Sequence, residues 1–196
     1  MIDMKVDPRV LRSREAVLRA AVDLLAERGA SGVTVEAISH RSGVAKTTIY
    51  RHWPEPSQLV LDAIRGLAQP CATPDTGSLR GDLTEILLGM ADNITTSSLA
   101  QVLPSLIDAA DRDAAMADVQ RVWVRERRAS LRHALERAEE RGEIDPGTDA
   151  DVLGAMCGGS LFYRRLVSHE PLDAAFISGV VENTLKIVGV TGDHSA

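Results

Sequence analysis

The sequence predicts an all-α fold of about nine helices arranged in two domains. Apolar residues recur at helical spacing along most of the 196 residues, as they do on one face of an amphipathic helix. No stretch alternates apolar and polar residues in the way that a half-buried strand does. Residues 69–78, QPCATPDTGS, hold two prolines and a glycine and indicate a linker. We therefore expect one domain over residues 1–68 and a larger one over residues 79–196.

Charge and cysteine content narrow the class of protein. The net charge is −6, but residues 1–68 hold 10 Lys and Arg against 8 Asp and Glu, while the remainder holds 12 against 20. An acidic protein can still bind a polyanion through such a locally basic part. No signal peptide is visible and no apolar run approaches the ~20 residues that cross a bilayer, so we expect a cytoplasmic protein without a membrane partner. Cys71 and Cys157 lack ligands at metal spacing, so we expect free thiols, no metal and no cofactor.

The first part of the chain predicts short helices separated by sharp turns. The apolar face of the first helix comprises Val17, Ala20, Ala21, Leu24 and Leu25. Arg28 and Gly29 form a C-terminal signal for this helix. Thr34 is a plausible N-cap for a shorter second helix that ends near Arg41. Residues 42–44, Ser-Gly-Val, then leave room only for a tight turn.

Two short helices joined by a glycine turn and braced by another have the geometry of a helix-turn-helix, whose second helix enters the DNA major groove. That helix is predicted over about residues 45–52, and its outward face is small and polar. The candidate DNA contacts on it are Ala45, Lys46, Thr47, Thr48, Tyr50 and His52. The lysine can reach a guanine or a phosphate, and Tyr50 and His52 can donate to phosphate oxygens. Ile49 and Trp53 are expected to turn inward.

Three further residues belong to the candidate DNA-binding set. They are Arg14, Thr34 and Ser42. Arg14 follows other basic residues ahead of the first helix, which extend the positive surface that a phosphate backbone would meet.

The stretch from Arg14 to Val60 resembles the DNA-binding domain of the TetR family of bacterial transcriptional regulators. The matching positions are Ala20-Ala21, Glu27, Gly29, Thr34-Val35, Ile38, Gly43-Val44, Lys46, Ile49-Tyr50, His52-Trp53 and Leu59. The resemblance implies a three-helix helix-turn-helix DNA-binding domain followed by a larger helical ligand-binding and dimerisation domain. It also implies a homodimer that binds a pseudo-palindromic double-stranded DNA operator and an unknown small-molecule effector.

The sequence departs from the family pattern at the start of a fourth predicted helix, whose apolar face holds Leu59 or Val60, Ala63, Ile64 and Leu67. Many members place a serine and a lysine where this chain has Glu55 and Pro56. Proline suits the first turn of a helix, so we expect the fold to be unaffected. One phosphate-binding cation is missing, so we expect a salt dependence of DNA binding that is shallower by about one phosphate per subunit.

The second domain is predicted to hold longer helices. Apolar stripes indicate helices near residues 83–94 and 99–110, a single long helix over about 115–140, and two last helices over about 149–168 and 172–188. Pro104 falls inside the second stripe, so that helix is expected to kink or to begin late. The last two helices carry apolar stripes at Val152, Ala155, Met156, Gly159, Phe162, Tyr163 and Leu166, and at Ile177, Val180, Val181, Thr184, Leu185 and Val188. These helices could pair with their copies in a four-helix dimer interface, or merely complete the core of the monomer.

Arg127 falls near the centre of the apolar stripe predicted for the long helix. A guanidinium that faces the interior must be paired. One reading pairs it with an internal carboxylate, Glu85 or Asp108; the other turns it into a pocket for an acidic or carbonyl-bearing ligand. The candidate ligand-binding residues are Met90, Leu103, Ile107, Trp123, Arg127, Met156 and Tyr163.

The preferred hypothesis is a dimeric repressor that an effector releases from its operator. An enzyme is the rival class, but the histidines are scattered and no metal-binding, phosphate-loop or nucleophile motif appears. A third possibility is a degenerate family member that binds a ligand or protein partner without specific DNA binding, and Pro56 keeps that possibility open.

Overall fold

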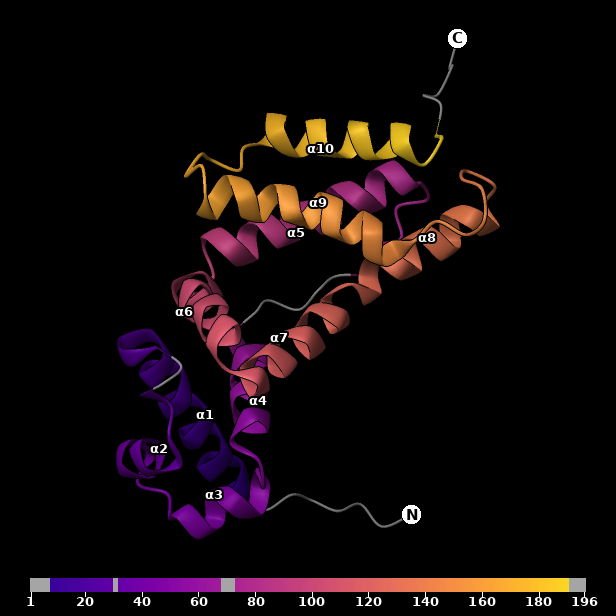
Figure 1. The fold of residues 1–196 in the computed structure, drawn as a ribbon. Coiled ribbons are helices and arrows are strands. Elements are labelled where there is room, and N and C mark those ends of the chain that lie inside the picture. The colour runs from indigo at the N-terminus through magenta and orange to yellow at the C-terminus, as the bar shows by residue number, and fades with distance from the viewer. Residues whose placement is uncertain (1–7, 30–31, 68–72, 191–196) are drawn as a thin grey trace, which may run out of the picture. The chain divides into compact units, whose positions relative to one another are not determined.

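The computed structural model describes residues 8–29, 32–67 and 73–190, and within these ranges the chain forms ten α-helices and no strands (Figure 1). The all-helical prediction is confirmed. Among the described residues, no helix combines the length and the apolar character needed to span a bilayer. The helices fall into two compact units, which comprise residues 1–68 with 98–123, and residues 69–97 with 124–196.

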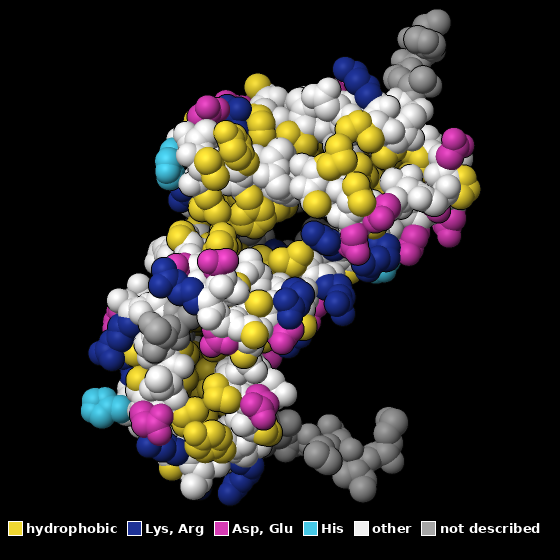
Figure 2. All heavy atoms as spheres, viewed as in Figure 1, with side chains coloured by type: hydrophobic (Ala, Val, Ile, Leu, Met, Phe, Trp, Pro, Cys, Tyr) yellow, Lys and Arg dark blue, Asp and Glu magenta, His cyan; other side chains and the backbone are white. Residues whose placement is uncertain are grey.

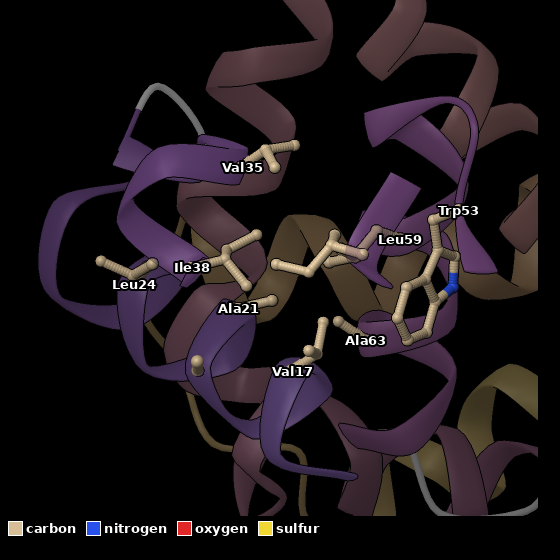
Figure 3. Packing of buried hydrophobic residues seen from close by; sticks show 10 residues of the cluster. Val17, Ala21, Leu24, Val35, Ile38, Trp53, Leu59 and Ala63 are labelled. Carbon is tan, nitrogen blue, oxygen red and sulfur yellow. The ribbon is translucent and has the colours of Figure 1, made fainter. Parts of the chain in front are cut away.

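The first unit begins with four helices. They are α1 (Pro8–Arg28), α2 (Val35–Ser42), α3 (Lys46–His52) and α4 (Pro56–Leu67). Their shared core is formed mainly by small and branched apolar side chains around one tryptophan. Figure 3 shows Val17 and Ala21 of α1, Ile38 of α2, and Leu59 of α4 packed together, with Trp53 at one end of the cluster. Trp53 is 4% exposed, so the expectation that it belongs to the core is confirmed.

A second apolar cluster in the same unit brings in helices from later in the chain. These are α6 (Ser98–Arg112), which runs through Pro104, and the first part of α7 (Ala114–Arg127). Leu25 and Ile64 pack in this cluster with Leu99, Leu106 and Val119. The division of the chain by contacts therefore differs from the predicted division by sequence, because residues 98–123 group with the N-terminal helices.

The second unit contains α5 (Leu79–Thr95), α8 (Ala129–Glu140), α9 (Ala150–Leu166) and α10 (Ala174–Ile187). Helix α5 contacts each of the other three, and α9 and α10 lie side by side (Figure 1). Ser78, Asp149 and Asp173 cap the N-termini of α5, α9 and α10 by accepting hydrogen bonds from backbone N–H groups. Of the predicted linker, residues 69–72 lie outside the described residues and 73–78 are not helical.

The prediction of one long helix over residues 115–140 is wrong. Helix α7 ends at Arg127 and α8 begins at Ala129, so the described residues form two helices where one was predicted. The two helices belong to different cores, since α7 buries Val119 in the first unit and α8 buries Leu131 and Leu135 in the second. The apolar stripe was predicted by continuing one helical period through residues 115–140. Because the helix is interrupted after Arg127, that single stripe cannot describe the buried faces of both α7 and α8.

Candidate nucleic-acid interface

Helix α3 presents a polar face on a firmly packed base. Ile49 is fully buried beneath it, whereas Lys46, Thr47 and Tyr50 are exposed and Thr48 is half-buried. Thr47 lies on the side opposite Ile49, because successive residues of a helix are rotated by about 100°. The predicted outward face is therefore available to a ligand, with short side chains at its centre.

The turn between α2 and α3 depends on a glycine. Gly43 has φ +70°, in the left-handed region, and its N–H donates to the carbonyl oxygen of Ser39 at 3.0 Å. The Ser39 hydroxyl donates to the carbonyl oxygen of Val44 at 2.8 Å, and the Ser42 hydroxyl accepts from the Val44 N–H at 3.2 Å. Ser42, a candidate DNA contact, thus also holds the turn in shape.

Thr34 also has a structural task. Its hydroxyl oxygen accepts a hydrogen bond from the Ala37 N–H at 3.1 Å, so the predicted N-cap of α2 is confirmed. The side chain is exposed, and its proposed contact with DNA stays a prediction.

Arg14 and Trp53 both bind the carboxylate of Asp62. The Arg14 guanidinium lies 2.7 Å from Asp62 Oδ2 and 5.6 Å from the centre of the Trp53 ring, and the indole N–H donates to the same oxygen at 3.0 Å. Burial alone would raise the pKa of Asp62, but the hydrogen bonds from Trp53, Arg14 and Arg65 outweigh it and hold that pKa below its ordinary value. This network fixes the end of α3 against α1 and α4.

Two more cations of the first unit are held by carboxylates. Lys46 Nζ lies 2.6 Å from Glu36 Oε1, and Arg41 donates to both carboxylate oxygens of Glu27 at 2.7 and 2.6 Å. Hydrogen bonds from Lys46 and Arg41 lower the pKa values of Glu36 and Glu27 respectively. The surface over α1–α4 accordingly mixes basic and acidic side chains (Figure 2).

Sequence reasoning missed Arg51. It is exposed on the last turn of α3 and forms no ion pair within the described part of the chain. It follows Thr47 by four residues, which places the two side chains on one face of the helix. That spacing was readable in the sequence and adds Arg51 to the candidate interface beside His52, which is also exposed.

The predicted ligand-binding residues are divided between the two units. Leu103, Ile107 and Trp123 belong to the first, and Met90, Arg127, Met156 and Tyr163 to the second. In the first unit, Leu103 and Trp123 line a small apolar pocket of about 20 Å³ together with Met116 and Gln120. Ile107 is outside this lining and is 37% exposed. Met116 and Gln120 were not predicted.

In the second unit, the expectation of an internal carboxylate for Arg127 is wrong for both candidates. Glu85 is exposed, and Asp108 is exposed and pairs with Arg112 at 2.9 Å. Arg127 itself is half-buried. The stripe that placed it at an interior centre crossed the break after α7, which explains the error.

Among the described residues of the second unit, the carboxylate that is fully buried is that of Asp82, near the start of α5. It accepts hydrogen bonds from the N–H and hydroxyl of Thr76 at 2.7 and 2.9 Å and from Arg137 at 3.2 Å. Arg141 lies 3.9 Å away. This cluster ties the segment before α5 to the end of α8.

One face of α9 is apolar and exposed. Val152, Met156 and Tyr163 are 56%, 47% and 62% exposed, while Leu153 and Leu161 on the other face are buried. On α10, Ile187 is 58% exposed. Part of the predicted stripe of α9 therefore does not complete the core of its own unit. Among the described residues, no three His, Cys, Asp or Glu side chains gather in a metal-binding cluster.

Family models match both parts of the chain. Residues 17–63 match the model for bacterial regulatory proteins of the tetR family, and residues 73–184 match the model for the tetracyclin repressor-like C-terminal domain. The chain is 31% identical over 186 residues to the uncharacterized HTH-type transcriptional regulator YdeS of Bacillus subtilis, covering 94% of this chain and 93% of YdeS. It is 28% identical over 176 residues to the DNA-binding transcriptional repressor TetR of Mycobacteroides abscessus, covering 88% and 92% of the two chains.

Solved structures agree with these matches. The crystal structure of the TetR family transcription regulator SCO0332 superposes with a TM-score of 0.68 at 35% sequence identity, covering 92% of this chain and all of that one (100%). Salmonella enterica GusR has the same fold, with a TM-score of 0.71 at 17% identity and coverage of 95% and 99%.

Proposed function

This chain belongs to the TetR family of bacterial transcriptional regulators, and we propose that it is a homodimeric repressor that a small-molecule effector releases from a pseudo-palindromic operator. As a helix-turn-helix regulator it is not an enzyme. The observation that carries the proposal is the exposed polar face of α3, set on buried Ile49 and Trp53 and preceded by the left-handed Gly43 turn. A related chain is named a transcriptional repressor, which favours repression over activation.

The DNA-binding part is tested by footprinting the purified protein on the DNA upstream of its own gene. We expect two protected half-sites whose centres lie about 34 Å apart, or a multiple of that spacing, because two recognition helices must enter successive major grooves. Thr47→Ala should weaken binding to the protected duplex more than binding to random DNA, whereas Arg51→Met should weaken both. If the protein binds the upstream duplex no more tightly than random DNA, or binds neither even at about 50 mM salt, the degenerate alternative is correct.

Repression is tested with a reporter gene placed behind the footprinted region. Deletion of the regulator should raise reporter expression, and an activator would give the opposite result. The two measurements separate DNA binding from the direction of regulation.

We further propose that the exposed apolar face of α9, together with α10, forms the subunit interface. A monomer in water would leave Val152, Met156 and Tyr163 uncovered along one face of α9. Met156→Glu should convert a dimer into a monomer in sedimentation analysis. Leu11→Glu is the matched control, since both residues are 47% exposed but Leu11 lies on α1. A dimer that withstands Met156→Glu would show that this face is not the interface.

The pocket beside Trp123 is our candidate for the part of the first unit that senses the effector. Its walls are apolar and Gln120 supplies a polar group, which suits an apolar ligand with one hydrogen-bonding end. The cavity of about 20 Å³ holds a water-sized molecule, so a larger effector requires its lining side chains to move. In a Trp53→Phe background, Trp123 fluorescence should change when an effector binds, and Leu103→Phe should abolish that response by filling the pocket without adding a second tryptophan. An effector response that survives this filling would place its binding site elsewhere.

A further inference from the structure

Lys46 is the first residue of the recognition helix α3. Its side chain is exposed, but it forms an ion pair with a neighbouring carboxylate. Its ammonium lies 2.6 Å from a carboxylate oxygen of Glu36, on the first turn of α2. Both side chains are largely accessible, at 50% and 65% exposure. The pair is therefore formed at the surface that the proposed function assigns to DNA.

We propose that Glu36 restrains Lys46 in the free protein, and that this ion pair must open before Lys46 binds a phosphate or a base. The inference rests on the proposed function, and it adds Glu36 as a residue that sets affinity without itself contacting DNA favourably. If Glu36 stayed paired with Lys46 in the complex, its carboxylate would lie close to the phosphate that Lys46 binds. The two negative charges would repel each other. DNA binding thus exchanges one anionic partner of Lys46 for another.

Folding does not require this carboxylate. The N-terminus of α2 is already capped by the Thr34 hydroxyl, and Ile38 anchors the helix in the core. A negative charge in the first turn of a helix is favourable, but the gain is small where the side chain is exposed. Glu36→Gln should therefore fold, and it removes the charge while keeping the length of the side chain.

The restraint is modest in size. Exposed ion pairs change an equilibrium constant by up to about fivefold, so Glu36→Gln should tighten binding of a random-sequence duplex by about two- to fivefold per subunit. The salt dependence should also steepen by up to about 0.9 per subunit, because the bound surface gains one net positive charge.

The experiment measures binding of a random-sequence 30-base-pair duplex and of the footprinted duplex by the full-length protein at about 50–200 mM salt. Glu15→Gln is the charge-matched control, since Glu15 is exposed on α1 and forms no ion pair among the described residues. It should give less than half the gain. In a Lys46→Met background, Glu36→Gln should give no gain beyond that of the control.

Two results would overturn the inference: wild-type binding without a gain in Glu36→Gln, or a gain that persists in full after Lys46→Met. Failure of the proposed function looks different, because then no variant binds either duplex. A measurement on the protein alone tests the pair directly: the carboxyl carbon of Glu36, followed by NMR, should titrate at higher pH in Lys46→Met than in wild type. An unchanged titration would show that the pair does not form in solution.

Discussion

Asp82→Asn is the most informative test of the second unit. The substitution keeps the shape of the side chain and one carbonyl oxygen, which can still accept from Thr76 at the end of the linker. It removes the buried negative charge, and it turns an amide N–H toward the Arg137 guanidinium that now lies 3.2 Å from the carboxylate. Two donors then face each other in a site where Asp82 has no exposure at all.

The expected loss follows from these contacts. Removing one partner of a buried ion pair costs about 3–5 kcal/mol when the other is left without compensation. Here Arg137 keeps 23% exposure and a second carboxylate, Asp75 at 3.5 Å, so part of its charge remains compensated. We therefore expect a loss of about 2–3 kcal/mol in the free energy of unfolding, and a fall in Tm of roughly 5–10 °C for a chain of this length.

Urea unfolding followed by circular dichroism measures this loss. Asp108→Asn is the control, because its ion pair with Arg112 joins two exposed side chains and should contribute at most about 0.5 kcal/mol. Arg137→Met should destabilise the protein as well, and the double variant should lose less than the sum of the two single losses. Equal urea midpoints for Asp82→Asn and Asp108→Asn would refute the assignment of Asp82 as the internal anchor.

Acid unfolding gives an independent check on the same group. Burial alone would raise the pKa of Asp82, but hydrogen bonds from Thr76 and Arg137 together outweigh burial and lower it. A carboxyl whose folded-state pKa is depressed contributes stability above its unfolded pKa of about 3.9, and this contribution disappears as the pH falls toward the folded value. The stability difference between wild type and Asp82→Asn should therefore shrink below about pH 4.

Substitutions at three further sites, one of them with a control, test local features. Gly43→Ala should destabilise the first unit by about 1–2 kcal/mol in urea unfolding, because the cost is one of backbone conformation and an added Cβ meets no atom; Gly89→Ala, within α5, should instead be neutral or stabilising. Pro56→Lys should raise DNA affinity and steepen its salt dependence by about 0.9 per subunit, and no change in either would remove Pro56 from the interface. His169→Gly should raise stability by about 0.5–1 kcal/mol, since His169 has φ +55°, and a lower Tm would contradict this.

The helix-turn-helix was predictable because its signals are local. Thr34 caps α2 and Gly43 ends it, each within a few residues of the groups that it bonds. Ile49 and Trp53 recur at the helical spacing that buries one face of α3, and both are in the core. Pro56 begins α4, as its fixed φ favours.

The parts that sequence reasoning missed depend on distant partners. Asp82 and Arg137 are 55 residues apart, and nothing at either position reveals the other. Asp82 follows Leu79 by three residues, and this spacing places both side chains on one face of a helix. The sequence therefore did indicate a carboxylate on an apolar face. The predicted long helix is interrupted at Arg128, where the sequence has no glycine or proline to signal a break. The interruption is explained by the packing of α7 and α8 in two separate cores.

The return of α6 and α7 to the N-terminal helices limits how this regulator can be dissected. The polypeptide passes between its units after residues 68, 97 and 123, so no single cut separates them. A fragment that stopped at residue 68 would retain the cluster around Trp53 but would strip Leu25, Val60 and Ile64 of the side chains that cover them. Such a fragment would expose this apolar surface to water and tend to self-associate. To isolate α1–α4 in soluble form, the exposed apolar residues would have to be replaced by polar ones. Alternatively, the order of the helices in the chain could be redesigned so that α6 and α7 stay attached.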